Sequence, residues 1–265
     1  MELYYREMGE GQPLVILHGL FGFSDNWQTQ AKKFSEYYRV ILVDLRNHGH
    51  SPWSSDFSYP IMVEDLVRLF QKLDLQQVIL LGHSMGGKVA MHLSQRYPDY
   101  IQKLIIVDMG VKSYPMHHQH ILEAFNRIDL NKLSARSEAE QILKQFIDSE
   151  GVRQFLLKNL YWREKGKLSW RLNFPVLEAA MPEILSALPE DEVLITTLFI
   201  RGALSNYILD EDIPVIESYF PDSTLVSIEN AGHWVHALQC FGDQAFIETI
   251  LWHFVYKTLA AHWVV

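Results

Sequence analysis

The sequence has little cysteine and no long apolar run. Cys240 is its one cysteine, which excludes an internal disulfide and a zinc site built from several cysteines. No stretch approaches the roughly 18 consecutive apolar residues of a membrane-spanning helix. The first residues, Met1–Arg6, have neither the basic nor the apolar region of a signal peptide. We therefore expect a cytoplasmic protein that has no membrane partner.

Positive charge is also scarce. The chain has 23 Lys and Arg against 32 Asp and Glu, which gives a formal net charge of −9, and it has no basic run. Phosphate backbones are bound by basic patches, so we expect no nucleic-acid partner. Hydrophobic residues make up 48% of the 265 residues and charged residues 21%, which excludes wholesale disorder. We expect a globular protein that is a monomer or a weak homodimer.

Short apolar runs alternate with helical patterns along most of the chain. Each run is too short for a helix and rich in Val, Ile and Leu, which is typical of strands buried on both faces of a parallel sheet. The runs are Pro13–His18, Arg39–Asp44, Gln77–His83, Lys103–Asp108, Thr197–Gly202 and Thr224–Glu229. The helical patterns are Ile61–Leu73, Met85–Tyr97, Ile213–Tyr219 and Cys240–Leu259. The alternation predicts an α/β fold with a mostly parallel central sheet and helices on both faces. We expect Leu3–Met8 to add an antiparallel edge strand through a hairpin.

The alternation breaks between about Val111 and Thr196. This stretch has helical periodicity, then aromatic residues and prolines, but no run that predicts a strand. The periodic segments are His120–Ile128, Glu138–Ser149 and Val152–Asn159. About 85 residues are too many for a crossover between two core strands. We therefore predict a helical lid over residues 111–196, inserted into a core made of residues 1–110 and 197–265.

The motif at residues 82–86, Gly-His-Ser-Met-Gly, lies between an apolar run and a helical pattern. A Gly-x-Ser-x-Gly motif between a strand and a helix is typical of a nucleophile elbow, a strained turn that exposes the serine hydroxyl. Ser84 would also lie at a helix N-terminus, where free backbone amides favour developing negative charge. We predict that Ser84 is a nucleophile. The alternative is a tight turn with an inert serine.

A serine hydroxyl is a poor nucleophile until a base takes its proton. His233 is the candidate base, because it follows the last apolar run and histidine titrates near working pH. Asp108 ends a run that should neighbour the elbow strand, and it keeps the chain order Ser, Asp, His. We assign Asp108 to orient His233, with Ser205 as a helper hydrogen bond; a turn or helix cap is the alternative role for Asp108. His236 is expected to support or pack around the site.

The oxyanion of an acyl-transfer reaction needs two preorganised N–H donors. The elbow supplies the amide of Met85. The loop after the first buried strand supplies the amide of Leu20, with Phe21 as the alternative. The histidines at positions 117, 118 and 120 do not share one helix face, and no Gly-x-Gly-x-x-Gly motif follows the first strand. We therefore expect no metal and no cofactor.

Taken together, these residues resemble those of α/β-hydrolase fold serine hydrolases. Asp44–Ser51 resembles the structural Asp-x-Arg-x-x-Gly-x-Ser loop of that family. The segments His18–Gly22, Gly82–Lys88 and Gly151–Asn159 are similar, more narrowly, to the YbfF-like bacterial esterases. The resemblance implies that small to medium acyl carboxylic esters, or acyl-CoA thioesters, are hydrolysed through an acyl-enzyme on Ser84. It also implies that the acid follows the strand ending at Asp108.

Two other functions stay open on the same fold, because a fold does not determine a reaction. One is cleavage of a carbon–carbon bond or a cofactor-free lyase reaction. The other is a non-catalytic, ligand-binding protein. The joint presence of Ser84, Asp108 and His233 argues against the second, because a binding protein has no physical need for all three.

Overall fold

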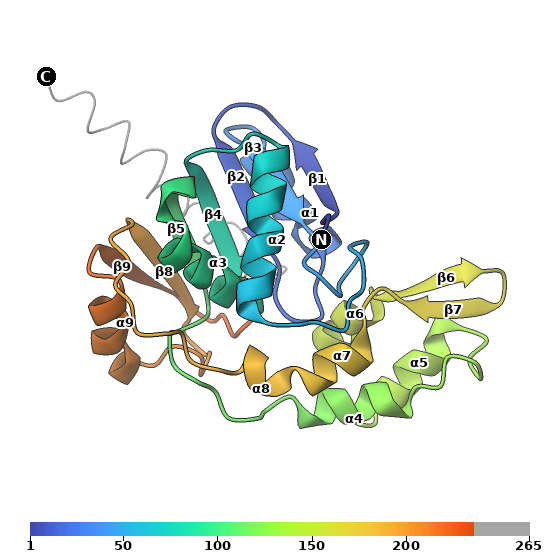
Figure 1. Cartoon of the computed structure of the whole chain (residues 1–265). Coiled ribbons are helices and arrows are strands. Elements are labelled where there is room, and N and C mark those ends of the chain that lie inside the picture. The colour runs from blue at the N-terminus through green and yellow to red at the C-terminus, as the bar shows by residue number, and fades with distance from the viewer. Residues whose placement is uncertain (236–265) are drawn as a thin grey trace, which may run out of the picture.

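The computed structural model (Figure 1) describes residues 1–235 and has a seven-stranded sheet at its centre, in the order β1-β3-β2-β4-β5-β8-β9. The strands are β1 (Tyr5–Met8), β2 (Pro13–Leu17), β3 (Arg39–Val43), β4 (Val78–His83), β5 (Ile101–Val107), β8 (Thr197–Gly202) and β9 (Ser223–Ile228). All neighbouring strands run parallel except β1 and β3. The predicted mostly parallel α/β sheet is therefore confirmed. The helix predicted at Cys240–Leu259 and the packing residue His236 lie outside the described residues.

Strand β1 corrects one prediction. It is an antiparallel edge strand, but its partner is β3, with Tyr5 opposite Val43, so it forms no hairpin with β2. Strand β3 pairs with β2 in parallel, from Pro13 opposite Arg39 to Leu17 opposite Val43. Because β3 lies between β1 and β2 in the sheet, the chain that leaves β1 passes β3 to reach the position of β2.

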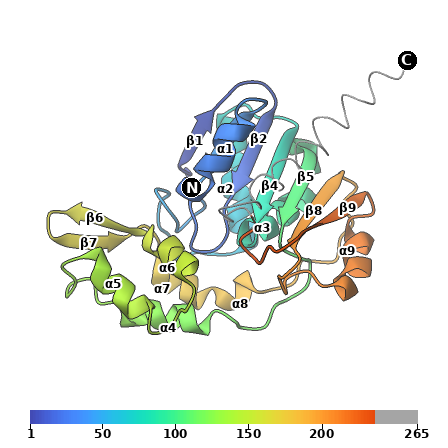
Figure 2. The same cartoon turned by 180° about the vertical axis from the view of Figure 1, so that it is seen from behind.

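Helices cover both faces of the sheet, as Figures 1 and 2 show from opposite sides. The helices of the core are α1 (Gln28–Phe34), α2 (Tyr59–Lys72), α3 (Met85–Arg96) and α9 (Ile213–Tyr219), with the short 3-10 turns η1 (Ser24–Trp27), η2 (Pro98–Tyr100) and η3 (Asp210–Asp212). Alternate residues of β2 divide between two buried clusters. Val15 and Leu17 pack with α2 and α3, whereas Leu14 and Ile16 pack with α1. This two-sided burial explains why the strands are continuous apolar runs.

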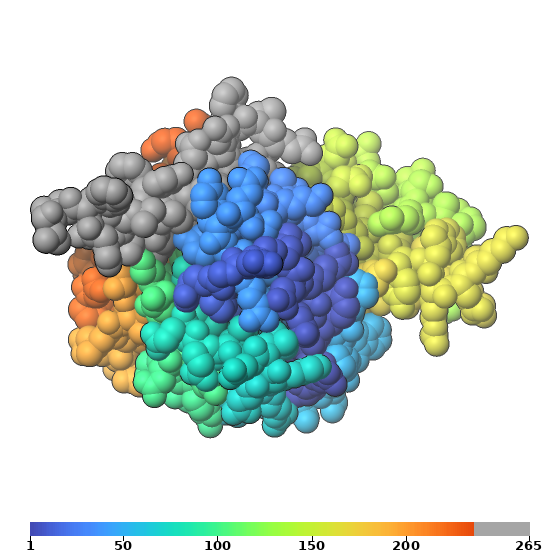
Figure 3. Space-filling view, turned by 90° about the horizontal axis from the view of Figure 1, so that it is seen from above, coloured from blue at the N-terminus to red at the C-terminus, as the bar shows by residue number. Residues whose placement is uncertain are grey.

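The segment that we predicted to be a lid (residues 111–196, called the lid segment below) connects β5 to β8 and lies across the carboxyl ends of the strands (Figures 1 and 2). Its elements are α4 (Gln119–Arg127), α5 (Arg136–Leu143), α6 (Glu150–Leu157), β6 (Leu160–Glu164), β7 (Lys167–Trp170), α7 (Phe174–Ala179) and α8 (Met181–Ile184). From above, the lid residues project as a lobe on one side of the core (Figure 3). Within the described residues, no helix has the length and apolar character needed to span a membrane.

The lid segment is mainly helical, as predicted, but it also contains the antiparallel hairpin of β6 and β7, which the sequence analysis missed. The turn at residues 165–166 is Lys-Gly, and Gly166 has a φ of 80°, a conformation that glycine adopts without steric cost. This turn between two short aromatic segments was the available signal. Helix α5 also ends at Leu143, whereas the periodicity predicted a helix up to Ser149.

Candidate active site

The register of the sheet brings the ends of three strands to one level. His83 of β4 lies opposite Val107 of β5, and Val107 lies opposite Ile200 of β8. The residues that follow β4 and β5 are Ser84 and Asp108, so backbone pairing alone places them side by side. The amide of Ser84 donates to the carbonyl oxygen of Val107 at 3.0 Å, which extends the ladder to the predicted nucleophile.

Ser84 lies on a strained turn between β4 and α3. Its φ is 52° and its ψ is −119°, a conformation that costs free energy for any residue other than glycine. A Cβ on Gly82 would lie 2.3 Å from the carbonyl oxygen of Gly86, and a Cβ on Gly86 would lie 2.6 Å from that of Leu17. The turn therefore closes only because both positions are glycine, which is the physical basis of the elbow motif.

The structure brings together the three side chains predicted to form the triad. Nδ1 of His233 lies 2.8 Å from Oδ2 of Asp108, and Nε2 of His233 lies 3.0 Å from Oγ of Ser84. The carboxylate can only accept a hydrogen bond, so Nδ1–H donates to it and Nε2 accepts from the serine hydroxyl. This is the tautomer that a general base needs.

Asp108 is completely buried, and its carboxylate receives hydrogen bonds from three directions. Besides His233, the amide of Gly202 donates to Oδ1 at 3.0 Å, and the hydroxyl of Ser205 donates to Oδ2. The helper hydrogen bond of Ser205 thus goes to the carboxylate. A buried carboxylate needs such partners, because an unpaired charge in the interior is costly. The backbone of Asp108 has a φ of 48°, which turns the chain sharply after β5.

The two predicted oxyanion donors come from segments next to Ser84: Met85 follows it in the chain, and Leu20 follows Gly19, which lies close to Cβ of Ser84. Neither Leu20 nor Met85 donates its amide proton to another described residue, so both remain available to a substrate. The amide of Phe21, the alternative, already donates to Nε2 of His48 at 3.2 Å. Burial lowers the pKa of His48 to about 3, so its imidazole stays neutral and can accept that bond. Leu20 is therefore the better candidate of the two.

Glycine also lets the loop after β2 approach the nucleophile. A Cβ on Gly19 would lie 2.8 Å from Nδ1 of His83 and 3.1 Å from Cβ of Ser84. Any larger residue would push the loop, and the amide of Leu20 with it, away from the serine. The amide of Gly22 closes this turn by donating to the carbonyl oxygen of Gly19 at 2.9 Å.

The loop at residues 44–51, which resembles the structural loop of the family, fixes the loop after β2 from outside. The carboxylate of Asp44 accepts from the amide of Ser24 at 2.6 Å and from the amide of His50 at 2.8 Å. The amide of Leu45 donates to Nε2 of the buried His18 at 3.0 Å. Burial lowers the pKa of His18, which keeps this nitrogen an acceptor.

The lid segment contacts the site at several points. The side-chain amide of Asn159 donates to the carbonyl oxygen of Phe21 at 2.7 Å, next to the oxyanion loop. The rings of Phe155 and Trp234 lie 4.2 Å apart, beside His233. Phe155 thus packs directly over the loop that carries His233, the predicted base.

Two residues at the site had no signal in the sequence. Tyr207 stacks on the imidazole of His233, with 3.8 Å between the ring centroids and 13° between the planes. Nε2 of His83 lies 3.0 Å from the backbone carbonyl oxygen of His233. Both contacts join segments more than 20 residues apart, which no local pattern reveals.

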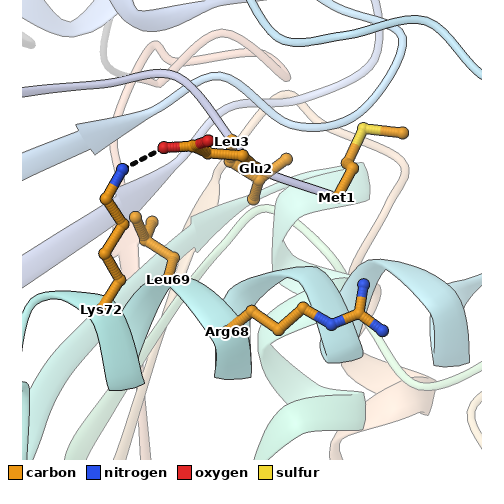
Figure 4. A pocket seen from close by; sticks show the side chains of 6 residues that line it. All are labelled: Met1, Glu2, Leu3, Arg68, Leu69 and Lys72. Carbon is orange, nitrogen blue, oxygen red and sulfur yellow. Dashed lines mark hydrogen bonds and ion pairs between the residues drawn. The ribbon is translucent and has the colours of Figure 1, made fainter.

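A shallow hollow of about 290 Å³ lies elsewhere, between the N-terminal segment and α2 (Figure 4). It is lined by Met1, Glu2, Leu3, Arg68, Leu69 and Lys72, and Glu2 forms an ion pair with Lys72 across it. The carboxylate of Glu2 and the amine of Lys72 are paired with each other, and the lining has no serine–histidine pair like that of Ser84 and His233. Within residues 1–235, no group of three His, Cys, Asp or Glu side chains is arranged to hold a metal ion.

Comparison with known proteins agrees with this geometry. Residues 12–137 match the family described as the alpha/beta hydrolase fold. A putative esterase/lipase of Haemophilus influenzae is 39% identical over 225 residues, 84% of this chain and 77% of that protein. Esterase YbfF of Escherichia coli is 36% identical over 226 residues, 85% and 87% of the two chains. The sn-1-specific diacylglycerol lipase ABHD11 of Danio rerio is 36% identical over 240 residues, 86% and 75% of the two chains.

Among solved structures, a marine microorganism esterase is 41% identical and superposes with a TM-score of 0.91, over 94% of this chain and 98% of that one. The chain belongs to the α/β-hydrolase fold family. The predicted fold class, the predicted family resemblance and the predicted enzyme class, a carboxylic-ester hydrolase, are confirmed by these comparisons.

Proposed function

We propose that this protein hydrolyses small to medium acyl carboxylic esters through an acyl-enzyme on Ser84. The observation that carries the proposal is the continuous chain of hydrogen bonds from Asp108 through His233 to Ser84, with distances of 2.8 and 3.0 Å. This chain activates a hydroxyl that the elbow exposes at the carboxyl end of the sheet. Relatives named as esterases support the same reaction.

In the first half of the reaction, Nε2 of His233 takes the proton of Ser84 as Oγ attacks the ester carbonyl carbon. The carbonyl oxygen gains negative charge, and the amides of Leu20 and Met85 donate to it. The imidazolium then gives its proton to the leaving alcohol, and the acyl group remains on Oγ. In the second half, His233 takes a proton from a water molecule, whose oxygen attacks the acyl carbon. The bond between the acyl carbon and Oγ then breaks, the imidazolium returns its proton to Oγ of Ser84, and the acid is released.

Asp108 holds the imidazole in the tautomer that presents Nε2 to the serine, and its charge stabilises the imidazolium. The bonds from Gly202 and Ser205 keep this carboxylate in place and charged within the interior. Ser205 therefore acts through the carboxylate, and its loss leaves the bond between Asp108 and His233 available.

We also propose that residues 111–196 form a lid over a core made of residues 1–110 and 197–265. The packing of Phe155 on Trp234 and the bond from Asn159 to Phe21 support it, because both reach the catalytic end. We further propose that the protein is cytoplasmic and acts on small molecules, because the single cysteine fits a reducing compartment and the net charge of −9 does not fit a nucleic-acid partner. We propose that it is a monomer or a weak homodimer. Size-exclusion chromatography with light scattering tests the oligomeric state.

The substrate class is tested by a hydrolysis screen on p-nitrophenyl esters of increasing acyl length. The screen also includes acyl-CoA thioesters, a diacylglycerol and a diketone whose hydrolysis breaks a carbon–carbon bond. The diacylglycerol is included because relatives carry that name. We expect the highest kcat/KM on short to medium esters and a loss of at least about 10⁴-fold in Ser84→Ala. Preference for the diketone, or ester turnover that survives in Ser84→Ala, would overturn the proposal.

A further inference from the structure

The imidazole of His233 has an aromatic ring lying flat against one of its faces. The ring of Tyr207 is 13° from parallel, with its centroid 3.8 Å from that of the imidazole. Most aromatic pairs in proteins lie further apart, with centroids about 4.5–7 Å from one another. The contact therefore covers one face of the base while leaving both of its nitrogens in the plane of the triad.

Tyr207 is anchored by its backbone on both sides. Its amide donates to Oγ of Ser205 at 3.3 Å, and Ser205 in turn donates to the carboxylate of Asp108. Its carbonyl oxygen accepts from the hydroxyl of Tyr114 at 2.9 Å. Ser205, which donates to the carboxylate of Asp108, thus also fixes the backbone beneath the stacked ring.

The lid segment anchors the outer end of the ring. The hydroxyl oxygen of Tyr207 lies 2.6 Å from Nε2 of His117, and Nδ1 of His117 lies 2.7 Å from the carbonyl oxygen of Pro115. A carbonyl oxygen only accepts, so Nδ1–H donates to Pro115 and Nε2 is left to accept from the tyrosine. Burial raises the pKa of Tyr207, which keeps its hydroxyl protonated as this donor.

The stack is suited to a base that becomes a cation. When His233 takes the serine proton it becomes an imidazolium, and the face of an aromatic ring attracts a cation. Asp108 is the charged group that faces His233 among the described residues. His83 meets it through a carbonyl oxygen, and His118 is kept neutral by burial and neighbouring histidines, which lower its pKa to about 3. Two further rings lie near the imidazole, that of His83 at 4.9 Å and that of Trp234 at 5.7 Å between centroids. The ring of Tyr207 lies nearer than either and flat on the imidazole, so it is a further source of stabilisation for the imidazolium.

We propose that Tyr207 is a positioning residue for His233, whose ring holds the imidazole in the triad plane and favours its protonated form, and that His117 at the entry to the lid holds that ring. The inference rests on the proposed function for its effect on turnover. Its effect on the imidazole itself does not, because the stack exists without substrate.

The decisive comparison is between Tyr207→Phe, which keeps the ring, and Tyr207→Leu, which removes it. We expect Tyr207→Leu to lower kcat by about threefold to tenfold and to move the acid limb of the kcat/KM profile to lower pH. We expect Tyr207→Phe to stay within about twofold of the wild type, and His117→Ala to match it, because both lose only the outer anchor. Tyr219→Leu, on the distant helix α9, is the matched control and should change neither quantity.

An NMR titration of the His233 imidazole in the same variants gives a readout that needs no turnover. We expect its midpoint to fall in Tyr207→Leu and to stay near that of the wild type in Tyr207→Phe. If Tyr207→Leu does not fold, phenylalanines with one, two and three fluorine atoms at position 207 keep the ring and weaken its π face. We then expect the midpoint to fall with each fluorine.

A midpoint that is unchanged across Tyr207→Leu or the fluorinated series would overturn the inference, as would equal losses in Tyr207→Phe and Tyr207→Leu. A wild type without ester turnover but with the expected midpoints would refute the proposed function and keep the stack. If Ser84→Ala loses turnover but Tyr207→Leu does not, and the His233 midpoint stays constant, the role of Tyr207 is refuted and the proposed function is kept.

Discussion

The catalytic end of the sheet and the lid segment above it are held in place by different kinds of contact. At the sheet, paired backbones set the positions, because His83, Val107 and Ile200 lie opposite one another and Ser84 and Asp108 follow directly. The lid segment instead meets the site through single side chains. The bond from Asn159 to the carbonyl oxygen of Phe21 is an example. Catalytic geometry thus depends on cooperative pairing, whereas lid position depends on individual residues.

One buried residue of the core joins the two regions. Nζ of Lys88, on α3 one turn after the nucleophile, donates to the carbonyl oxygens of Val111 at 3.1 Å, Lys112 at 2.8 Å and Ser186 at 2.9 Å. The first two carbonyls lie where the chain enters the lid segment, and the third lies close to where it leaves. Lys88 is fully buried, so these three bonds replace its water shell. Helix α3, which begins directly after Ser84, therefore also holds the two end regions of the lid segment in place.

Breaking the triad should have the largest effect. Asp108→Asn presents an amide that no longer favours the required tautomer, so we expect kcat to fall by about 10⁴-fold with the fold intact. Steady-state kinetics and circular dichroism measure the two parts. Ser205→Ala removes only a bond to the carboxylate, and we expect a loss of about tenfold or less. The reverse ranking of these two variants would show that Asp108 is not the acid.

Removing the three hydrogen bonds of Lys88 should have the largest effect among the changes that act on the lid segment. Lys88→Met keeps a similar volume but removes all three bonds, and of the three carbonyl oxygens only that of Val111 keeps a described donor, the amide of Leu188 at 2.7 Å. We therefore expect unfolding to become easier by about 2–4 kcal/mol. Urea denaturation at pH 7 measures this. Lys33→Met, on the exposed side of α1, is the control and should stay within about 0.5 kcal/mol. Equal stability of the two variants would mean that Lys88 does not hold the lid segment.

The difference in stability between the wild type and Lys88→Met should also depend on pH. Burial lowers the pKa of Lys88 from 10.5 to about 7. Between these two values the unfolded chain binds more protons at this residue than the folded chain does, so stability rises with pH there. We expect the stability of the wild type relative to Lys88→Met to increase from pH 7 to pH 9, by about 1 kcal/mol per unit at most. A difference that is constant or falls over this range would contradict the burial argument.

Breaking one lid contact should have the smallest effect. Asn159→Ala removes the bond to the carbonyl oxygen of Phe21, and one hydrogen bond is worth about 1 kcal/mol, so we expect kcat/KM to fall by about fivefold. The control is Trp162→Ser on the exposed hairpin strand β6, where we expect less than a twofold change. A larger loss of kcat/KM in Trp162→Ser than in Asn159→Ala would show that the lid segment supports turnover through a contact other than that of Asn159.

The same difference between the regions decides what could be predicted from the sequence. The strands, the elbow and the triad follow from local patterns, since a buried parallel strand is a continuous apolar run and a strained serine needs glycine on both sides. Asp108 could be located because it directly ends such a run. These predictions depend on backbone geometry, which short stretches of sequence encode strongly.

The contacts made by single side chains could not be predicted in this way. The stack of Tyr207 on His233, the three bonds of Lys88 and the bond of Asn159 each join residues distant in sequence, and no spacing rule marks them. The pairing of β1 with β3 was missed for a related reason, because a hairpin is the local default and tertiary pairing overrode it. The hairpin of the lid segment did have a local signal, the Lys-Gly turn at residues 165–166.

Covalent labelling with a fluorophosphonate probe, followed by mass spectrometry of the labelled peptide, tests the convergence of the triad most directly. We expect the wild type to be modified on Ser84, Ser84→Ala to stay unmodified, and His233→Ala to react at least about 10³-fold more slowly. A wild-type protein that resists the probe, or that carries the label on another residue, would contradict the account.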